Sequence, residues 1–126
     1  MASVLLIDDE ELMHNVVNSY LKRYGKQHDL EINVKALHDP VQGFLETSMY
    51  GSNYDLILLD LRLPKLSGDE IYNSLKQLRP ELLERVLFVT AYGEELQNRL
   101  HGEEVHILQK PFLYNNFETA ISTMLS

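Results

Sequence analysis

Five residues that could bind a cation or a phosphoryl group follow apolar stretches of this 126-residue sequence: Asp8, Asp9, Asp60, Thr90 and Lys110. Three carboxylates that lie close together repel one another, so their pKa values are coupled and partly raised unless a hard cation sits among them. Mg²⁺ suits such a place because it prefers oxygen ligands and retains several waters. A hydroxyl and an ammonium beside it would stabilise the charge of a phosphoryl group. The residue types are therefore compatible with a site for a hard cation and a negatively charged oxygen group, provided that the fold brings them together.

Each of these residues also has an ordinary structural explanation. An Asp directly after a strand is commonly a loop residue or a helix N-cap. Thr90 could simply end a β-branched strand, and Lys110 could be a surface lysine. Only their joint occurrence, at the ends of different apolar runs, favours a functional site.

Five apolar runs alternate with five helix-like stretches, with neither an internal repeat nor a Gly/Ser/Pro-rich linker. The predicted strands cover residues 3–7, 31–37, 54–59, 86–89 and 105–109. Residues 56–59 are apolar on both faces, as a strand covered by helices on each side must be. The alternation predicts an α/β fold, a (βα)5 flavodoxin-like, doubly wound parallel five-stranded sheet of order 2-1-3-4-5. In that order strands one, three, four and five direct their carboxyl ends toward one crevice, where the five residues would converge.

Helical periodicity predicts the first two helices. The first has a broad apolar face and closes at Gly25. That face comprises Leu12, Val16, Tyr20 and Tyr24, with Met13, Val17 and Leu21 alongside. The second starts with Asp39 as N-cap and Pro40 as first residue, and it stops at Gly51. Its apolar stripe comprises Val41, Phe44, Leu45 and Met49.

Three further helices are expected. Ser67 and Glu70 have the spacing of a capping box at the start of the third, which ends before Pro80. Its core residues are Ile71, Leu75 and Leu78. The fourth, over 94–101, has only Leu96 and Leu100 as core anchors and should be short and marginal. The last packs through Leu113, Phe117, Ile121 and either Met124 or Leu125.

Length and composition limit the possible functions. The chain suffices for one domain, 1–126, and its 44% hydrophobic and 24% charged residues are typical of a soluble globular protein. A formal net charge of −8 with scattered Lys and Arg opposes direct nucleic-acid binding. The absence of cysteine excludes disulfides, thiolate metal sites and cysteine nucleophiles. The first apolar run is too short for a signal peptide or a membrane helix, so a cytoplasmic location without membrane contact is expected.

Four segments resemble the receiver domains of two-component signalling. They are Leu-Leu-Ile-Asp-Asp-Glu at 5–10, Leu-Leu-Asp-Leu-Arg-Leu-Pro-Lys-Leu-Ser-Gly at 58–68, Val-Thr-Ala at 89–91 and Gln-Lys-Pro-Phe at 109–112. Pro64 and Gly68 follow Asp60 by four and eight residues, near the family spacing. The resemblance covers the whole chain, and it implies a response-regulator receiver domain, a phosphoprotein that works in two-component or phosphorelay signal transduction.

The resemblance also implies a role for each site residue. Asp60 is the phosphoacceptor, a nucleophile that forms an acyl phosphate. Mg²⁺ is bound directly by Asp9, Asp60 and the backbone carbonyl of Arg62, and through water by Asp8. Lys110, the Thr90 hydroxyl and the Ala91 amide contact the phosphoryl oxygens. The Lys110–Pro111 bond matches the family's cis peptide.

The expected partners follow from the same resemblance. A histidine kinase or a histidine phosphotransfer protein donates the phosphoryl group. A downstream effector or a second copy binds the face made by the fourth helix, the fifth strand and the last helix. The chain is expected to catalyse only its own phosphorylation and dephosphorylation.

Three features depart from the family pattern. Ile107 occupies a position on the fifth strand where an aromatic switch residue is common. Arg62 and Tyr92, two residues after Asp60 and Thr90, are large where water would approach the phosphoryl group. The segment 90–110 is slightly short, in keeping with a weak fourth helix.

Other functions stay open as alternatives. A pseudo-receiver would use the same fold as a binding module without becoming phosphorylated. A hydrolase or mutase with an aspartyl-phosphate intermediate usually carries a second Asp two residues after the nucleophile, where this chain has Arg62. A flavodoxin needs a phosphate-cradling loop, and the acidic residues 8–11 would repel phosphate. The five histidines share no ligand spacing and are expected on the surface or partly packed.

Overall fold

The sheet has the predicted topology. The computed structural model of the protein describes residues 1–125, so of the expected domain only Ser126 lies outside the described residues. Five parallel strands pair in the order β2-β1-β3-β4-β5, which confirms the doubly wound fold. The strands are Ala2–Ile7 (β1), Ile32–Leu37 (β2), Leu56–Leu59 (β3), Val86–Thr90 (β4) and His106–Gln109 (β5).

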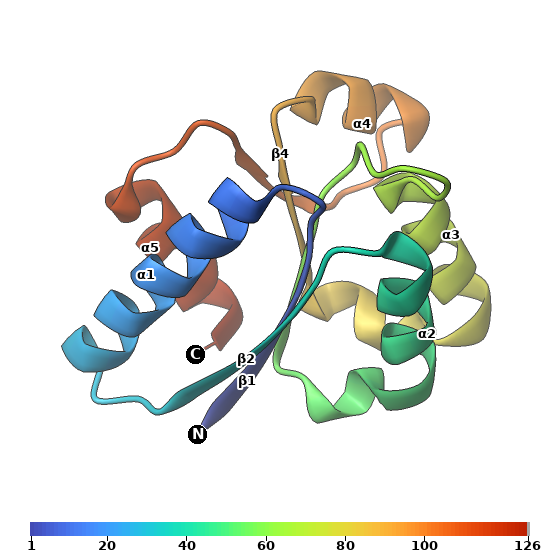
Figure 1. Ribbon diagram of the computed structural model, residues 1–126. Coiled ribbons are helices and arrows are strands. Elements are labelled where there is room, and N and C mark those ends of the chain that lie inside the picture. The colour runs from blue at the N-terminus through green and yellow to red at the C-terminus, as the bar shows by residue number, and fades with distance from the viewer. Residues whose placement is uncertain (126) are drawn as a thin grey trace.

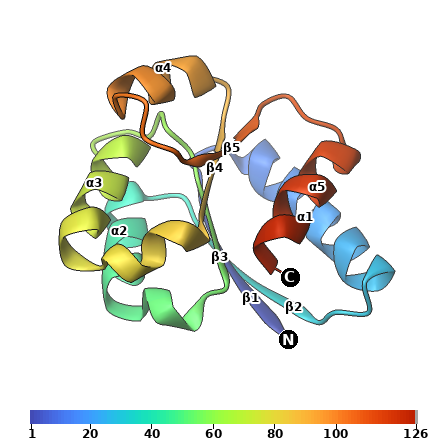
Figure 2. The ribbon, with the colours of Figure 1, turned by 180° about the vertical axis from the view of Figure 1, so that it is seen from behind.

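Helices cover both faces of the sheet, as Figures 1 and 2 show. The helices are Glu11–Gln27 (α1), Pro40–Tyr50 (α2), Gly68–Leu78 (α3), Gly93–Arg99 (α4) and Tyr114–Leu125 (α5). Two short 3₁₀ segments, Gly51–Asn53 (η1) and Pro80–Arg85 (η2), precede β3 and β4 and were not predicted. Successive side chains of a strand point to opposite faces. Val4 and Leu6 therefore join the core under α1 and α5, and Leu5 and Ile7 join the core under α2, α3 and α4.

The register of the strands aligns their carboxyl ends. Ile7 of β1 lies opposite Leu59 of β3, so Asp8 and Asp60 come directly after paired residues. The Asp60 amide donates to the Ile7 carbonyl at 3.1 Å, which holds the two strand ends together. The Lys110 amide likewise donates to the Thr90 carbonyl at 2.8 Å. Backbone pairing therefore determines which loops meet at this edge.

The predicted face and end of α1 were partly wrong. Its buried residues are His14, Val17, Leu21 and Tyr24, whereas Leu12 is 72% exposed. The helix continues two residues past Gly25, and Asp29 adopts the left-handed conformation in the turn. Gly25 instead permits a close crossing, because a Cβ there would lie 2.7 Å from the Leu30 carbonyl oxygen.

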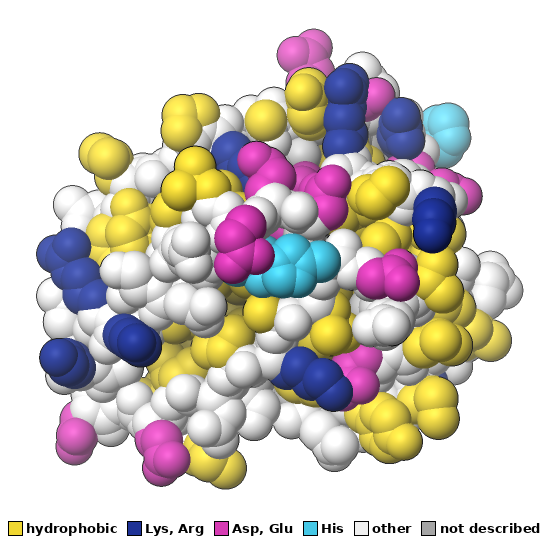
Figure 3. Space-filling view, in the orientation of Figure 1, with side chains coloured by type: hydrophobic (Ala, Val, Ile, Leu, Met, Phe, Trp, Pro, Cys, Tyr) yellow, Lys and Arg dark blue, Asp and Glu magenta, His cyan; other side chains and the backbone are white. Residues whose placement is uncertain are grey.

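The predicted apolar stripe of α2 was mostly wrong, since of its four residues only Phe44 packs against the core. Val41, Leu45 and Met49 are exposed, and hydrophobic side chains gather over α2 in the space-filling view (Figure 3). The buried residues are Pro40, Gly43 and Thr47. Gly43 explains this choice, since a Cβ at that position would lie 2.7 Å from an Ile7 methyl carbon. The helix packs close to the sheet through its small residues.

The remaining helices confirm most of the prediction. Ile71 and Leu75 of α3 are buried, but Leu78 is 61% exposed because the helix ends there. The helix α4 is short, as expected, and Leu96 and Leu100 are its buried anchors.

Leu113 precedes α5 and is 74% exposed, so its predicted core role was wrong. Phe117 and Ile121 are buried as predicted, together with Tyr114, while Met124 and Leu125 are partly buried.

Within residues 1–125, no helix is both long and apolar enough to cross a membrane.

Candidate functional site

Three carboxylates converge where β1 and β3 end. Oxygen atoms of Asp8, Asp9 and Asp60 all lie within 4.8 Å of one another. Asp8 and Asp60 are 1% and 5% exposed, whereas Asp9 is exposed. Buried carboxylates need partners, because desolvation of an unpaired charge is costly. The cluster is therefore a place that attracts a cation while remaining open to solvent on the Asp9 side.

Lys110 supplies one cation to this cluster. Its Nζ donates to Asp8 Oδ2 at 3.0 Å, to Asp60 Oδ2 at 3.2 Å and to Glu10 Oε1 at 3.0 Å. Burial alone would lower the pKa of Lys110, but the hydrogen bond with Asp8 and the charges of Asp60 and Asp8 outweigh burial and raise it. Lys110 is therefore an ammonium, fixed between the ends of β1 and β3 although it follows β5.

Asp60 has the hydrogen bonds of a positioned carboxylate. Its Oδ1 accepts from the Leu61 amide at 2.7 Å, and its Oδ2 faces Lys110. Burial is the largest influence and raises the pKa of Asp60, the charge of Lys110 opposes it, and the charge of Asp8 adds to the rise. A cation placed among the three carboxylates would favour the ionised form that a nucleophile requires.

Thr90, Ala91 and Lys110 lie together at the ends of β4 and β5. The Thr90 side chain is fully buried, and its Oγ1 accepts from the Tyr92 amide at 3.1 Å. The Ala91 carbonyl accepts from Gln109 Nε2 at 2.7 Å, and the Gly93 amide donates to Gln109 Oε1 at 3.2 Å. The Lys110–Pro111 peptide is cis, as the resemblance implied. The sequence did not single out Gln109, which ties the strand ends to the start of α4.

The loop after β3 depends on Gly68. A Cβ at this position would lie 2.1 Å from the Asp60 carbonyl oxygen, which is closer than any side chain can approach. The Gly68 amide donates to the Leu61 carbonyl at 2.8 Å, so the loop folds back to the strand from which it started. At the start of α3, Glu70 Oε1 accepts a hydrogen bond from the Ser67 amide at 3.1 Å. This confirms the predicted capping-box bond between the Glu70 side chain and the N-cap backbone.

Arg62 and Tyr92, from the segments after β3 and β4, contact each other. The Arg62 guanidinium carbon lies 3.6 Å from the centroid of the Tyr92 ring. Arg62 Nε and Nη2 both donate to Glu95 Oε2, at 3.2 and 3.0 Å. Glu95 also accepts from Arg99, which in turn reaches Asp69. The sequence had indicated the first two residues but not this chain of ion pairs to α4 and α3.

One histidine lies unexpectedly close to the site. His14 is 3% exposed, and its Nε2 donates to the Asp8 carbonyl at 2.6 Å. Its ring stacks on His38 with a centroid distance of 3.9 Å, and His38 Nε2 hydrogen-bonds Glu11 Oε2 at 2.7 Å. Sequence spacing gave no sign of this contact, because the two histidines come from α1 and from the turn before α2.

The donor set fits a hard divalent cation. Asp8, Asp9 and Asp60 supply carboxylate oxygens, and the exposed position of Asp9 leaves room for the waters that Mg²⁺ retains. The Arg62 carbonyl as a ligand and the Ala91 amide as a donor to phosphate stay predictions.

Comparison with known sequences gives a family match over most of the chain. The response regulator receiver domain family matches residues 4–122. The transcriptional regulatory protein CiaR of Streptococcus pneumoniae is 29% identical over 99% of this chain and 52% of its own length. The transcriptional regulatory protein SpaR of Bacillus subtilis is 35% identical over 89% of this chain and 46% of its own length. The chain thus spans about half the length of the curated relatives it matches.

Solved structures share the fold. A response regulator receiver domain protein from Clostridium thermocellum has a TM-score of 0.78 at 22% identity, covering 99% of this chain and 94% of that one. The receiver domain of a sensor histidine kinase from Pseudomonas aeruginosa has a TM-score of 0.80 at 21% identity, covering 98% and 97%. That domain was solved with a magnesium ion coordinated in its active-site cleft.

Proposed function

The chain belongs to the response regulator receiver domain family, and from this premise we propose that it is a magnesium-dependent phosphoacceptor whose Asp60 receives a phosphoryl group and thereby switches a protein interaction. One observation carries the proposal. Lys110 Nζ lies within 3.2 Å of carboxylate oxygens of both Asp8 and Asp60, so the cationic and acidic groups needed for phosphoryl transfer meet at one point. The domain 1–126 is proposed to act as a single unit.

The transfer step uses Asp60 as the nucleophile. A carboxylate oxygen attacks the phosphorus of a phosphohistidine in the donor protein. The new O–P bond forms as the N–P bond breaks, and the imidazole leaves with the electron pair. Phosphoryl transfer depends mainly on the positioning of the reacting atoms and on neutralisation of the charge on the phosphoryl oxygens. Lys110 would move from the free carboxylate to the phosphoryl oxygens, and the Thr90 hydroxyl and Ala91 amide would donate to them.

Asp9, Asp60 and the Arg62 carbonyl would hold Mg²⁺ directly, with Asp8 bound through water. The ion supplies neutralisation of the negative charge that the transfer gathers on the phosphoryl oxygens. Asp8 keeps Lys110 in place, and Asp8 Oδ1 also accepts from the Glu10 amide at 2.9 Å, so this carboxylate is oriented from two sides.

A histidine kinase or histidine phosphotransfer protein is the proposed donor. Leu12 and Leu113 are 72% and 74% exposed, and they lie just beyond the site residues Asp9 and Lys110 in the chain. Exposed large apolar side chains close to a reactive group are typical of a surface that a partner protein covers when it binds. Replacing either leucine by Glu should slow transfer from a phosphorylated donor protein, while labelling by a small phosphodonor should be unchanged.

The output is proposed to pass through α4, β5 and α5 to an effector protein or a second copy. Gln109 links the site to this face, because it contacts Ala91 and Gly93 and directly precedes Lys110. A shift of Lys110 or Thr90 toward a phosphoryl group would therefore pull on the start of α4. Ile107, at the position of the family's aromatic switch, is partly buried on β5.

Intact-mass spectrometry tests the assignment. Acetyl phosphate with Mg²⁺ should add the mass of one phosphoryl group to the wild type and to the control Asp29→Asn, whose left-handed backbone Asn tolerates. Asp60→Asn should not be labelled. Labelling of Asp60→Asn at the wild-type rate would refute the nucleophile, and absence of labelling in the wild type would instead identify a pseudo-receiver.

A further inference from the structure

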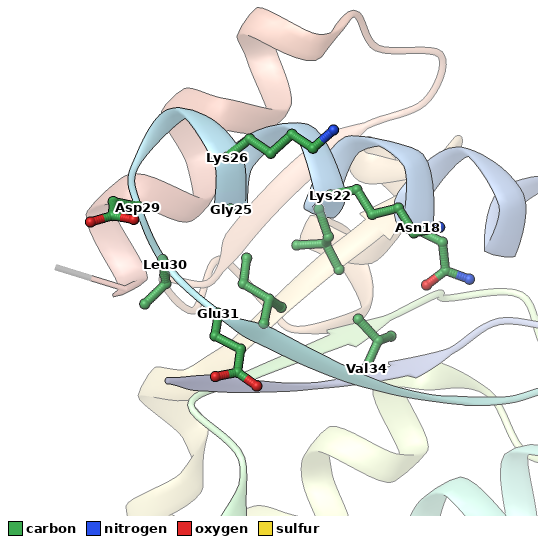
Figure 4. A pocket seen from close by; sticks show the side chains of 10 residues that line it. Asn18, Lys22, Gly25, Lys26, Asp29, Leu30, Glu31 and Val34 are labelled. Atoms are coloured by element: carbon green, nitrogen blue, oxygen red, sulfur yellow. The ribbon is translucent and has the colours of Figure 1, made fainter.

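A groove along the C-terminal half of α1, which contains none of the acidic site residues, is not explained by phosphoryl transfer. It lies between α1 and β2, with a volume of about 850 Å³. Leu21 of α1 and the side chains of Ile32 and Val34 on β2 form its apolar floor. Figure 4 shows Val34 pointing from β2 toward α1, and Lys22 and Lys26 along the α1 side of the groove.

The strand beside this groove has a free edge. Among the strands of residues 1–125, β2 pairs only with β1. The Glu31 and Leu37 carbonyls accept from the Ala2 and Asp8 amides, so their backbone groups face β1. Backbone groups of a strand alternate in direction with a period of two. Those of Ile32, Val34 and Ala36 therefore point outward, where another strand could bond to them.

The lysines of the groove lack acidic partners. The chain has six lysines, and Lys35, Lys76 and Lys110 form ion pairs. In the part of the chain that the structure describes, Lys22, Lys26 and Lys65 have no carboxylate within 4.0 Å. Two of these three therefore line one groove, in a chain of net charge −8.

Two acidic residues also border the groove but do not neutralise these lysines. Asp29 lies in the turn after α1, and Glu31 directly precedes β2. Figure 4 shows the Glu31 carboxylate pointing away from α1. The charge available to an incoming segment above Ile32 and Val34 is therefore positive.

We propose that this groove binds an extended acidic segment of a partner protein, which adds to the sheet as a sixth strand beside β2. Backbone bonds to Ile32, Val34 and Ala36 would give affinity, as in other cases of strand addition. A carboxylate near Lys22 and Lys26 and β-branched side chains on the apolar floor would give specificity. A second copy does not fit, because its own β2, Ile-Asn-Val-Lys-Ala-Leu, carries no carboxylate.

A designed peptide tests this surface on the 126-residue chain. The peptide alternates Thr with Val and has Glu at its centre, Thr-Val-Thr-Glu-Thr-Val-Thr, with blocked ends. Titration followed by amide NMR should shift resonances of α1 and β2, and the bound peptide should slow hydrogen exchange at the Ile32, Val34 and Ala36 amides. The peptide with Lys in place of Glu should bind at least tenfold more weakly.

Variants of the protein distinguish recognition of the peptide's charge from non-specific binding. Lys22→Glu with Lys26→Glu should raise the Kd of the acidic peptide about tenfold, and Lys65→Glu, which changes the third unpaired lysine, should alter it less than twofold. Both variants should be phosphorylated as the wild type is, which separates this surface from the phosphoacceptor function. Equal binding by the wild type and the double variant, or exchange protection outside β2, would overturn the proposal. So would lysine-dependent binding to phosphatidylserine vesicles without peptide binding, since it would identify a membrane surface.

Discussion

At the scale of single residues, the proposed site includes three buried polar residues, Asp8, Asp60 and Thr90. Thr90 is fully buried, and its hydroxyl oxygen accepts a hydrogen bond from the Tyr92 amide. It lies on β4, whereas Asp60, the proposed nucleophile, follows β3. We therefore propose that Thr90 reports the state of Asp60 to the next segment of the chain, rather than activating the carboxylate.

Thr90→Ala should therefore uncouple phosphorylation from its consequences. We expect labelling by acetyl phosphate to persist, while phosphorylation-dependent changes of amide resonances in α4 and β5 decrease several-fold. Thr90→Ser retains the hydroxyl and should behave as the wild type. Full resonance changes in Thr90→Ala would show that the signal does not pass through this hydroxyl.

A second polar cluster, formed by Tyr54, Glu46 and Lys35 and only partly buried, is expected to make the folding stability depend on pH. Tyr54 donates to Glu46 Oε2 at 2.5 Å and Lys35 to Glu46 Oε1 at 3.2 Å. The hydrogen bond from Tyr54, and then Lys35, lower the pKa of Glu46 despite partial burial. A carboxyl whose pKa is lowered by folding stabilises the fold above its unfolded pKa, and this stabilisation is lost as the pH falls through the folded pKa.

Glu46→Gln should cost about 1 kcal/mol of unfolding free energy at pH 7. Urea denaturation from pH 7 to pH 3 should show the difference from the wild type shrinking below about pH 4.3, the ordinary pKa of Glu. Glu84→Gln, an exposed carboxyl, should have little effect at any pH. A difference that is independent of pH would contradict the ionised Glu46 hydrogen bond.

At the scale of elements, α3 begins at Gly68, where no side chain fits against the end of β3. Gly68→Ala should destabilise the fold by about 3 kcal/mol, because the Asp60 backbone cannot move aside cheaply. Gly102→Ala is the matched control, since it has a φ of 77° but open space around it, and it should cost only about 1 kcal/mol. Thermal unfolding compares the two, and equal losses would mean that the loop adapts.

The same loop is bound to α4 through Arg62 and Glu95, and this link bears on the lifetime of the acyl phosphate. Arg62 and Tyr92 stack on each other, and they follow Asp60 and Thr90 by two residues, where by family resemblance water would approach the phosphoryl group. We expect Arg62→Asn with Tyr92→Glu to admit water and speed phosphate loss about tenfold, or roughly 1.4 kcal/mol of barrier. First-order decay after donor removal, measured in Mg²⁺, gives the rates. Glu95→Gln alone keeps both large side chains and should change the decay less.

Equal decay of the wild type and the Arg62/Tyr92 double variant would mean that these side chains do not limit the approach of water. It would leave the assignment of Asp60 intact, because labelling is measured separately.

At the scale of the whole molecule, cation binding should contribute to folding stability. The carboxylates directly follow β1 and β3, which are neighbours in the sheet, so a bound ion links segments distant in sequence. Mg²⁺ at ten times its Kd should stabilise the fold by roughly 1.4 kcal/mol, which raises Tm by a few degrees for a domain of this size. Asp9→Asn should remove most of this rise, while Asp29→Asn should retain it. A Tm independent of Mg²⁺ would count against the metal site.

The sequence by itself determined the order of the strands, the convergence of Asp8, Asp60 and Lys110, and the shortness of α4. These features rest on local patterns: apolar runs that end in polar residues, and the parallel topology that such runs require. A few residues in family spacing were enough to predict which of these side chains meet.

Only the tertiary structure decided which helix faces are buried. Sequence periodicity favoured the large residues Val41, Leu45 and Met49, but close packing against Ile7 selects the Gly43 face of α2. It also decided which polar residues meet across elements, such as Arg62 with Glu95 and His14 with the Asp8 carbonyl. Such contacts depend on distances between side chains that are remote in sequence, and neither hydrophobic period nor residue type encodes those distances.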